Sequence, residues 1–238
     1  MKRMEGKVVL ITGGSSGYGK ATAKRLVEEG AVVIIAARNL QMLEAAREET
    51  GCAYAIPMDV TAYGDWKRVY DVIVEQYGRL DVLINNAGGG VAIKDVTEQT
   101  PEEIDQSIAL NLNSVIYGTN TFAGLMKAQK GGTIINVSSV CAKEAWPGWS
   151  VYAAAKWGVL GFSKGAYVEL RPYNVRVTCL IPAAASTGFQ SAANLEGTER
   201  KLSVEDIAES ILYVCTLPDH AVVEELTIWG IDQEVNPL

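Results

Sequence analysis

Residues 7–19 read KVVLITGGSSGYG, and this stretch decides how the chain begins to fold. A short β-branched run ends at Gly13 and Gly14, further glycines follow at Gly17 and Gly19, and a helical apolar pattern then continues to Glu29. Glycines let a backbone approach a phosphate closely, and a helix that starts there directs N–H groups and a positive dipole end at it. Strand, glycine turn and helix in this order therefore predict a phosphate-binding loop at the end of a strand.

The alternation of strand and helix continues through the chain. Apolar runs that predict strands lie at 7–12, 31–37, 52–58, 80–85, 133–137, 175–181 and 224–229. Helical patterns lie at 19–29, 40–49, 63–77, 100–127, 150–170 and 204–216. Strands that alternate with helices predict right-handed βαβ units and a doubly wound parallel α/β sheet of about seven strands. We expect a single domain over residues 1–238, because open α/β sheets commonly reach this length.

Composition narrows the classes of partner. The formal net charge is -7, so a nucleic acid backbone would be repelled overall. The apolar run at the amino terminus is too short for a signal peptide or a membrane span, and we expect a cytoplasmic protein without a membrane partner. The four cysteines are far apart and predict buried free thiols. His220 is the only histidine, and no metal site is predicted.

Residues 138–156, SSVCAKEAWPGWSVYAAAK, place three groups that could move a proton. Tyr152 and Lys156 are four apart and share one face of a helix, and Ser139 ends a predicted buried strand beside that helix. A free phenol has a pKa of about 10. A nearby ammonium favours the phenolate, so we expect Lys156 to lower the pKa of Tyr152 into a useful range.

These motifs together resemble the short-chain dehydrogenase/reductase family over almost the whole chain. Thr12, Gly13, Gly17 and Gly19 match the family's cofactor loop, and residues 85–88, NNAG, match a second family motif. The resemblance implies a Rossmann-type fold, reversible reduction of a ketone to a secondary alcohol, and a homodimer or homotetramer. It also implies a catalytic set made of Asn111, Ser139, Tyr152 and Lys156. In that set Tyr152 exchanges the proton, Ser139 binds the carbonyl oxygen, Lys156 holds the ribose and tunes the phenol, and Asn111 anchors a relay water.

The cofactor implied is NADP(H). An NAD enzyme of this type has an acidic residue after the second strand, whereas this chain has Arg38 and Asn39, and a guanidinium can grip a 2′-phosphate. Asp59 resembles the residue that contacts adenine, and Val60 its apolar neighbour. The complete predicted cofactor site is Gly13, Ser15, Ser16, Gly17, Tyr18, Gly19, Arg38, Asn39, Asp59, Val60, Asn86, Ala87, Gly88, Tyr152, Lys156, Pro182 and Thr187.

The substrate site is defined less closely. Trp146 and Trp149 lie where the family walls its pocket beside Ser139, and they favour an apolar or ring-bearing ketone. Residues 183–203 predict a small lid, in which Ala183 replaces the usual glycine. Tyr18 replaces an aliphatic residue of the glycine loop. On the helix at 150–170, Val159 and Phe162 are predicted to supply part of an oligomer contact.

Three alternatives remain open. Within the same family the substrate could be a 3-hydroxy acid, a 3-oxoacyl thioester, a steroid or a pterin. The fold could also serve a non-catalytic NADP(H) sensor, because fold does not fix function. Finally, residues 13–17 satisfy G-x-S-x-G, which would make Ser15 the nucleophile of a serine hydrolase with His220 downstream.

Overall fold

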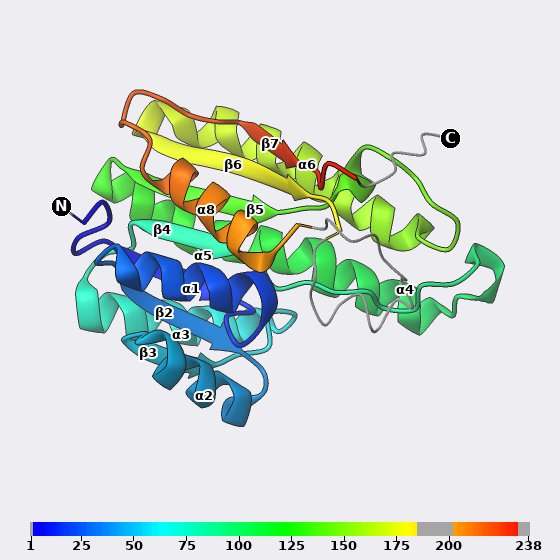
Figure 1. Ribbon diagram of the computed structural model, residues 1–238, viewed down its shortest axis with the longest axis horizontal. Helices are drawn as coiled ribbons and strands as arrows, with labels where there is room; N and C mark the ends of the chain where they lie inside the picture. Colours follow the sequence, from blue (N-terminus) through cyan, green and yellow to red (C-terminus); the bar gives the residue numbers. More distant parts are fainter. Residues whose placement is uncertain (1, 185–201, 233–238) are drawn as a thin grey trace.

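The computed structural model describes residues 2–184 and 202–232. Within them the chain forms one seven-stranded sheet, in which every neighbouring pair of strands is parallel. The order across the sheet is β3-β2-β1-β4-β5-β6-β7 (Figure 1). The strands are β1 (Val8–Thr12), β2 (Val32–Ala37), β3 (Tyr54–Pro57), β4 (Val82–Asn85), β5 (Gly132–Val137), β6 (Val175–Pro182) and β7 (Glu225–Ile228). The doubly wound fold predicted from the alternation of elements is confirmed.

Helices cover both faces of this sheet. They are α1 (Gly17–Glu28), α2 (Leu40–Thr50), α3 (Tyr63–Tyr77), α4 (Pro101–Ile108), α5 (Ser114–Gln129), α6 (Ser150–Leu170) and α8 (Val204–Cys215), with short 3-10 turns at Val96–Glu98, Val140–Ala142 and Arg171–Tyr173. In Figure 1, α1 and α8 lie in front of the sheet and α3 and α5 lie behind it.

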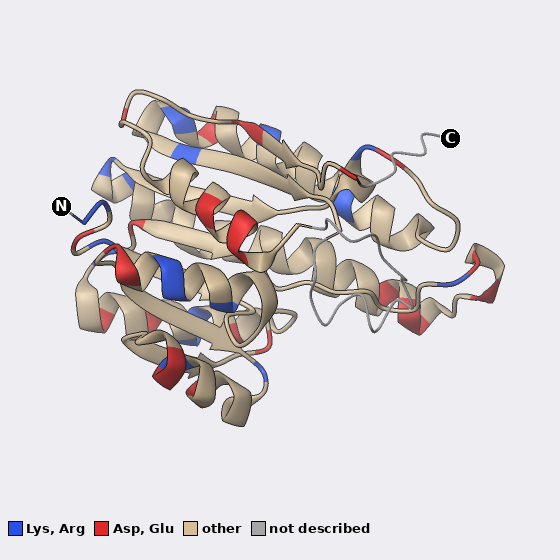
Figure 2. Cartoon of the chain, in the orientation of Figure 1, with Lys and Arg blue, Asp and Glu red and all other residues tan. Residues whose placement is uncertain are grey.

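The strands are apolar on both sides because each face has its own core. Val9 and Ile11 of β1 pack into the cluster that contains Leu26 of α1, whereas Val8 and Leu10 pack into the cluster that contains Trp66 of α3. Side chains alternate between faces along a strand, so a strand covered on both faces needs an unbroken apolar run. Figure 2 shows the charged residues mainly on the surrounding helices and loops.

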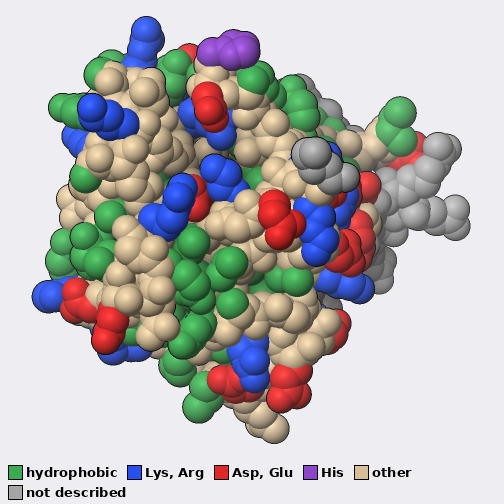
Figure 3. Space-filling view, turned by 90° about the vertical axis from the view of Figure 1, so that its left-hand side faces the viewer, with side chains coloured by type: hydrophobic (Ala, Val, Ile, Leu, Met, Phe, Trp, Pro, Cys, Tyr) green, Lys and Arg blue, Asp and Glu red, His purple; other side chains and the backbone are tan. Residues whose placement is uncertain are grey.

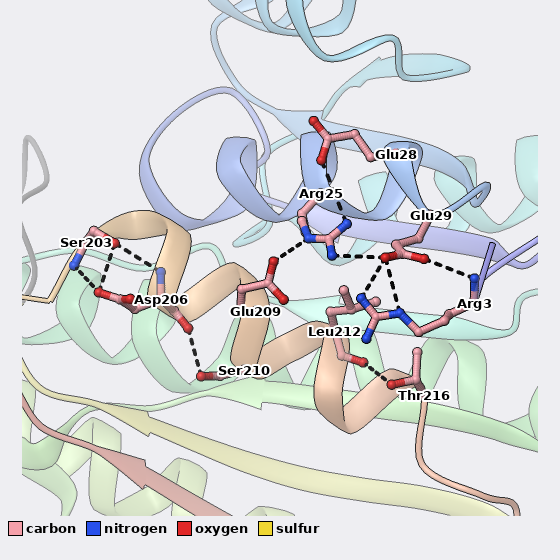
Figure 4. A network of polar contacts seen from close by, with 10 residues as sticks. All are labelled: Arg3, Arg25, Glu28, Glu29, Ser203, Asp206, Glu209, Ser210, Leu212 and Thr216. Carbon is pink, nitrogen blue, oxygen red and sulfur yellow. Dashed lines mark hydrogen bonds and ion pairs between the residues drawn. The ribbon is translucent and has the colours of Figure 1, made fainter. Parts of the chain in front are cut away.

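Two helices on the front face are joined by charged groups (Figure 4). Arg25 of α1 contacts Glu29 at 2.9 Å and also bonds to Glu209 of α8. Glu29 in turn accepts a bond from the Arg3 guanidinium at 2.6 Å, and these contacts lower the pKa of its carboxyl to about 2. The amino terminus, α1 and α8 are therefore linked by one exposed network.

The helix predicted over 100–127 is present, but it is not a regular α-helix throughout. The expected start is present, because Thr100 and Glu103 form a capping box at α4. The helix then widens into a π-helical turn, Ala109–Asn113, before α5 begins. Asn111 lies in this turn and its side-chain amide is bonded to the backbone of Gly89, a contact between distant segments that local sequence patterns do not reveal. Single π turns of this kind occur frequently at functional sites.

Two further comparisons with the sequence concern the surface and the thiols. Val159 is wrong as an oligomer contact, because its side chain is fully buried in the core, and Phe162 packs partly against the same cluster. All four cysteines are buried free thiols, as predicted. Among the described residues, no helix combines the length and the apolar character needed to cross a bilayer.

Candidate active site

The carboxyl ends of β1 and β4 are tied together by one buried hydroxyl. Thr12 Oγ1 accepts bonds from the N–H groups of Asn86 and Ala87 at 3.0 and 3.1 Å. The Asn86 side chain returns a bond to the Thr12 carbonyl at 2.9 Å. Thr12 was recognised in the sequence only as part of a motif; its hydroxyl fixes the relative position of the two glycine-rich strand ends.

The glycine loop is shaped as a close-fitting turn. Gly13 has a φ of +68°, in the left-handed region that favours glycine. A Cβ on Gly14 would lie 2.5 Å from Ile35 Cγ2, so the loop passes directly over β2. Ser16 starts α1 without a side-chain cap bond, and the first turn of the helix contains no acidic residue. The amino end of α1 thus suits a phosphate, which would supply the missing acceptor and the negative charge.

Ser139, Tyr152 and Lys156 meet beside this loop, at the end of β5. The Ser139 hydroxyl is hydrogen-bonded to the Tyr152 phenol and accepts a bond from Cys141 N–H at 3.2 Å. Lys156 Nζ lies 5.6 Å from the centre of the Tyr152 ring and donates to the Val137 carbonyl at 3.0 Å. The sequence correctly placed Tyr152 and Lys156 on one side of a helix.

Burial decides the pKa values of this pair. Tyr152 and Lys156 are 8% and 3% exposed. Burial raises the pKa of the Tyr152 phenol well above its ordinary value, although the bond from Ser139 acts to lower it. Burial also lowers the pKa of the Lys156 ammonium from 10.5 to about 8. The prediction of a lowered phenol pKa is therefore wrong here, because desolvation of the phenolate outweighs the lowering effect of the Ser139 hydroxyl.

Asn111 approaches the same space from the opposite side. Its Oδ1 accepts from Gly89 N–H at 3.0 Å, and its Nδ2 donates to the carbonyls of Gly89 and Ser107 at 2.9 and 3.1 Å. A Cβ on Gly88 would lie 3.0 Å from Asn111 Oδ1 and 3.3 Å from Lys156 Nζ. Gly88 therefore lies between these two polar groups, and the four residues of the predicted catalytic set surround the ends of β4 and β5.

Comparison with known proteins agrees with this arrangement. A family model described as short chain dehydrogenase matches residues 7–197. The chain belongs to the short chain dehydrogenase family. An uncharacterized oxidoreductase of Staphylococcus aureus strain MW2 is 32% identical over 224 residues, which cover 93% of this chain and 96% of that protein. A second, from Staphylococcus epidermidis strain RP62A, is 30% identical and covers 96% and 99% of the two chains.

Solved structures show the same likeness in three dimensions. A metagenomic short-chain oxidoreductase in complex with NADP has a TM-score of 0.84 at 30% identity, with 95% of this chain and 97% of that chain covered. A closed form of serine dehydrogenase complexed with NADP+ has a TM-score of 0.91 at 26% identity, with 97% and 98% covered. The fold of this short chain dehydrogenase is thus shared along nearly its full length.

The remaining cofactor residues predicted for this dehydrogenase lie along the rim of the sheet. Arg38 follows β2, is exposed, and has no hydrogen bond or ion pair to another described residue. Asn39 caps α2 by accepting from Met42 N–H at 3.0 Å. Asp59 Oδ1 accepts from both the N–H and the hydroxyl of Thr61, and the side chain of Val60 is largely buried. Arg38 is the charged group of this set that remains open to a ligand.

The two tryptophans predicted to line the substrate pocket have different surroundings. The Trp149 ring stands edge-on to Tyr152, with ring centres 5.4 Å apart. Trp146 instead packs against the hydrophobic core. Trp149 is therefore the indole next to the reactive groups.

Tyr18 and Ala183, the two departures from the family motifs, contact each other. The Tyr18 hydroxyl donates to the Ala183 carbonyl at 3.5 Å. Ala183 follows Pro182 of β6, donates its own N–H to Ile228 at 2.8 Å, and lies outside the left-handed backbone region. Alanine therefore fits without strain. Thr187 and most of the predicted lid lie outside the described residues.

The serine hydrolase hypothesis fails on position. Ser15 lies in the glycine loop, after the carboxyl end of β1. His220 lines a pocket together with Lys7 and Asp81, which precede β1 and β4 at the amino ends of the strands. Ser15 lies at the carboxyl ends of the strands and His220 at their amino ends, so the two side chains cannot act as one catalytic unit.

Proposed function

We propose that this short chain dehydrogenase reversibly reduces a ketone to a secondary alcohol with NADPH. The observation that carries the proposal is the hydrogen-bonded Ser139–Tyr152 pair with the buried Lys156 ammonium beside it. Bound NADPH would supply the hydride. The chain supplies the proton, the oxygen-binding groups and an enclosed site.

Tyr152 is the proposed proton donor for reduction. Its phenol is protonated at neutral pH, which is the form that can protonate a carbonyl oxygen, and because burial raises its pKa the phenolate left by that transfer needs stabilising neighbours. Ser139 adds a hydroxyl that can bond to the same oxygen as negative charge develops on it. Lys156 lies close enough to stabilise the phenolate that results, and its own pKa of about 8 suits it to return a proton to that phenolate. Asn111 holds the polar space next to Lys156 and would anchor the relay water.

The glycine loop and Arg38 support NADP(H) over NAD(H). The amino end of α1 would hold the pyrophosphate, and the exposed Arg38 guanidinium would hold the 2′-phosphate. Solved relatives in complex with NADP are consistent with this choice. We expect Arg38→Ala to lower the ratio of kcat/KM for NADPH over NADH by at least about tenfold, from the loss of charge-assisted hydrogen bonds. Arg47→Ala, which removes a guanidinium paired with Glu44 on α2, is the matched control, and an unchanged ratio in Arg38→Ala would refute the assignment.

The substrate proposed first is an apolar or ring-bearing ketone, because the Trp149 indole contacts Tyr152. A second candidate is the oxidation of a 3-hydroxy acid, favoured by the likeness to serine dehydrogenase. Steroids, pterins and 3-oxoacyl thioesters belong to the same test. We place the enzyme in the cytoplasm, in keeping with four buried free thiols.

Self-association is proposed through the outer face of α6. Trp157 and Val168 are 54% and 64% exposed, and they are 11 positions apart, which corresponds to about three helical turns, so they share one face. Sedimentation should give a dimer or tetramer. Trp157→Glu should shift the protein towards monomer, whereas a monomeric wild-type protein would refute this part of the proposal.

The decisive experiment measures NADPH consumption over a panel of ketones, 3-oxo esters, 3-oxoacyl thioesters, steroids, pterins and quinones, and NADPH formation from 3-hydroxy acids including serine. Tyr152→Phe should lower the rate at least about 100-fold, as expected for loss of a general acid. It should leave NADPH binding, followed by fluorescence, within about twofold of wild type, because the phenol hydroxyl is only a small part of the cofactor site. NADPH binding without turnover of any substrate would instead support the sensor alternative.

A further inference from the structure

A second pocket lies at the amino ends of the strands, whereas the candidate active site lies at their carboxyl ends. Its volume is about 450 Å³, within the range of small-molecule sites. Residues at the starts of β1, β4, β5 and β6 line it, together with the segment after α8. Figure 3 looks onto this side of the molecule and shows several Lys and Arg side chains around its centre, with a few acidic side chains among them.

Arg176 supplies a positive charge that no carboxylate neutralises. Its Nη2 donates to Thr133 Oγ1 at 2.8 Å, and its Nη1 donates to the Leu217 carbonyl at 2.9 Å. All its hydrogen-bond acceptors in the described part of the chain are neutral, and no described carboxylate lies within ion-pair distance. The guanidinium is thus fixed in the wall of the pocket with its charge uncompensated.

The rest of the lining adds to this excess. Lys7 and Arg79 share one carboxylate, that of Asp81, with Lys7 Nζ at 3.7 Å from Oδ1 and Arg79 Nε at 3.0 Å from Oδ2. Lys130 is exposed at the end of α5 and has no ion pair with a described residue. The other lining carboxylate, Asp219, is exposed. Four cations therefore face two carboxylates, although the chain as a whole has a net charge of -7.

We propose that this pocket binds a small molecule carrying a phosphate group. A fixed guanidinium, flexible ammonium groups and the adjoining His220 imidazole are the donors that bind phosphate oxygens. The local excess of positive charge would also attract an anion that the acidic remainder of the surface repels. The site is separate from the proposed cofactor site, because the glycine loop and Arg38 lie at the carboxyl ends of the strands.

Calorimetric titration of the protein saturated with NADP(H), which would occupy the proposed cofactor site, tests the proposal, with inorganic phosphate and pyrophosphate as probes and sodium chloride of equal ionic strength as the blank. Tighter binding of pyrophosphate would support a phosphorylated metabolite, and equal or tighter binding of phosphate would support the free ion. We expect Arg176→Gln to weaken binding at least about tenfold, as for a charged hydrogen bond from a half-buried, fixed guanidinium, and Lys130→Ala about two- to fivefold, as for an exposed charge. Lys67→Ala, which removes a charge on α3 outside both the pocket and the proposed cofactor site, should leave the affinity unchanged.

Three results would overturn the assignment: neither probe binds, binding survives unchanged in both pocket variants, or binding is lost in Lys67→Ala. Arg176 also supports the backbone at Leu217, so circular dichroism should establish that Arg176→Gln is folded. If it is not, Lys130→Glu provides the test from the exposed rim. It should weaken pyrophosphate binding more than Lys130→Ala, and equal affinity in the wild type and both Lys130 variants would refute the site.

Discussion

The buried charge of Lys156 should make the stability of the protein depend on pH, with a cost at neutral pH that is lost in alkaline solution. Burial lowers the pKa of its ammonium from 10.5 to about 8. Below pH 8 the ammonium is charged in both the folded and the unfolded state, and its burial then lowers the free energy of unfolding by the full amount. Between pH 8 and 10.5 only the unfolded state keeps the proton, so this penalty shrinks as the pH rises. Above pH 10.5 the group is neutral in both states and the penalty is gone. A difference of this size corresponds to about 3 kcal/mol.

Lys156→Met removes the titrating group and keeps a similar shape. The same substitution leaves the Val137 carbonyl without the Lys156 ammonium that donates to it at 3.0 Å. This loss lowers the free energy of unfolding of the variant by about 1 to 3 kcal/mol and offsets the gain from removing the buried charge. The absolute change in stability at pH 7 is therefore small. The informative quantity is its change with pH: relative to Lys156→Met, wild type should gain about 2 to 3 kcal/mol in free energy of unfolding between pH 7 and pH 10.

Urea denaturation of both proteins at the two pH values measures this difference, because other titrating groups are common to both and cancel. Lys164→Met is the matched control, since Lys164 lies on the same helix with a side chain that is 58% exposed. A charge that is hydrated in both states should give the same stability change at both pH values. A wild-type advantage that does not grow with pH for Lys156→Met would refute the claim that burial sets the protonation of this site.

Three other outcomes follow from the same structure. Gly118→Ala should lower the free energy of unfolding by about 1 to 3 kcal/mol, because the added Cβ would lie 2.6 Å from the Trp66 ring. On the same helix, the Cβ of Gly124→Ala meets nothing within 4 Å, and this variant should raise the free energy of unfolding by about 0.5 to 1 kcal/mol. Urea titration measures both changes, and equal effects would contradict the packing at Gly118. Thr12→Val should cost about 2 to 4 kcal/mol and weaken NADPH binding, because it leaves two N–H groups without an acceptor; fluorescence titration and denaturation check both effects. The kcat/KM for ketone reduction should fall above pH 8 as Lys156 loses its proton, and a flat profile from pH 7 to 10 would contradict its proposed role.

Sequence patterns predicted most of the helices and strands, because residues close together in the chain determine where these elements form. The helix bounds Tyr63–Tyr77 and Ser150–Leu170 agree with the structure, since apolar periodicity is a property of neighbouring residues. The same reasoning correctly placed Asn111 within a helix but failed to reveal the π turn there, in which the Asn111 amide bonds to a loop 22 residues away. It also failed at Val159, because periodicity does not reveal which face of a helix another element covers.

By itself, the sequence determined the parallel sheet, the glycine loop and the proximity of Tyr152 to Lys156, because spacing along a helix or after a strand fixes these features. Only the tertiary structure decided the protonation of that pair, because pKa values depend on burial by residues distant in the chain. It likewise placed His220 far from Ser15 and gathered Lys7, Lys130 and Arg176 around one pocket. Charges separated by more than 40 residues in sequence become neighbours only when parallel strands align their amino ends at one edge of the sheet.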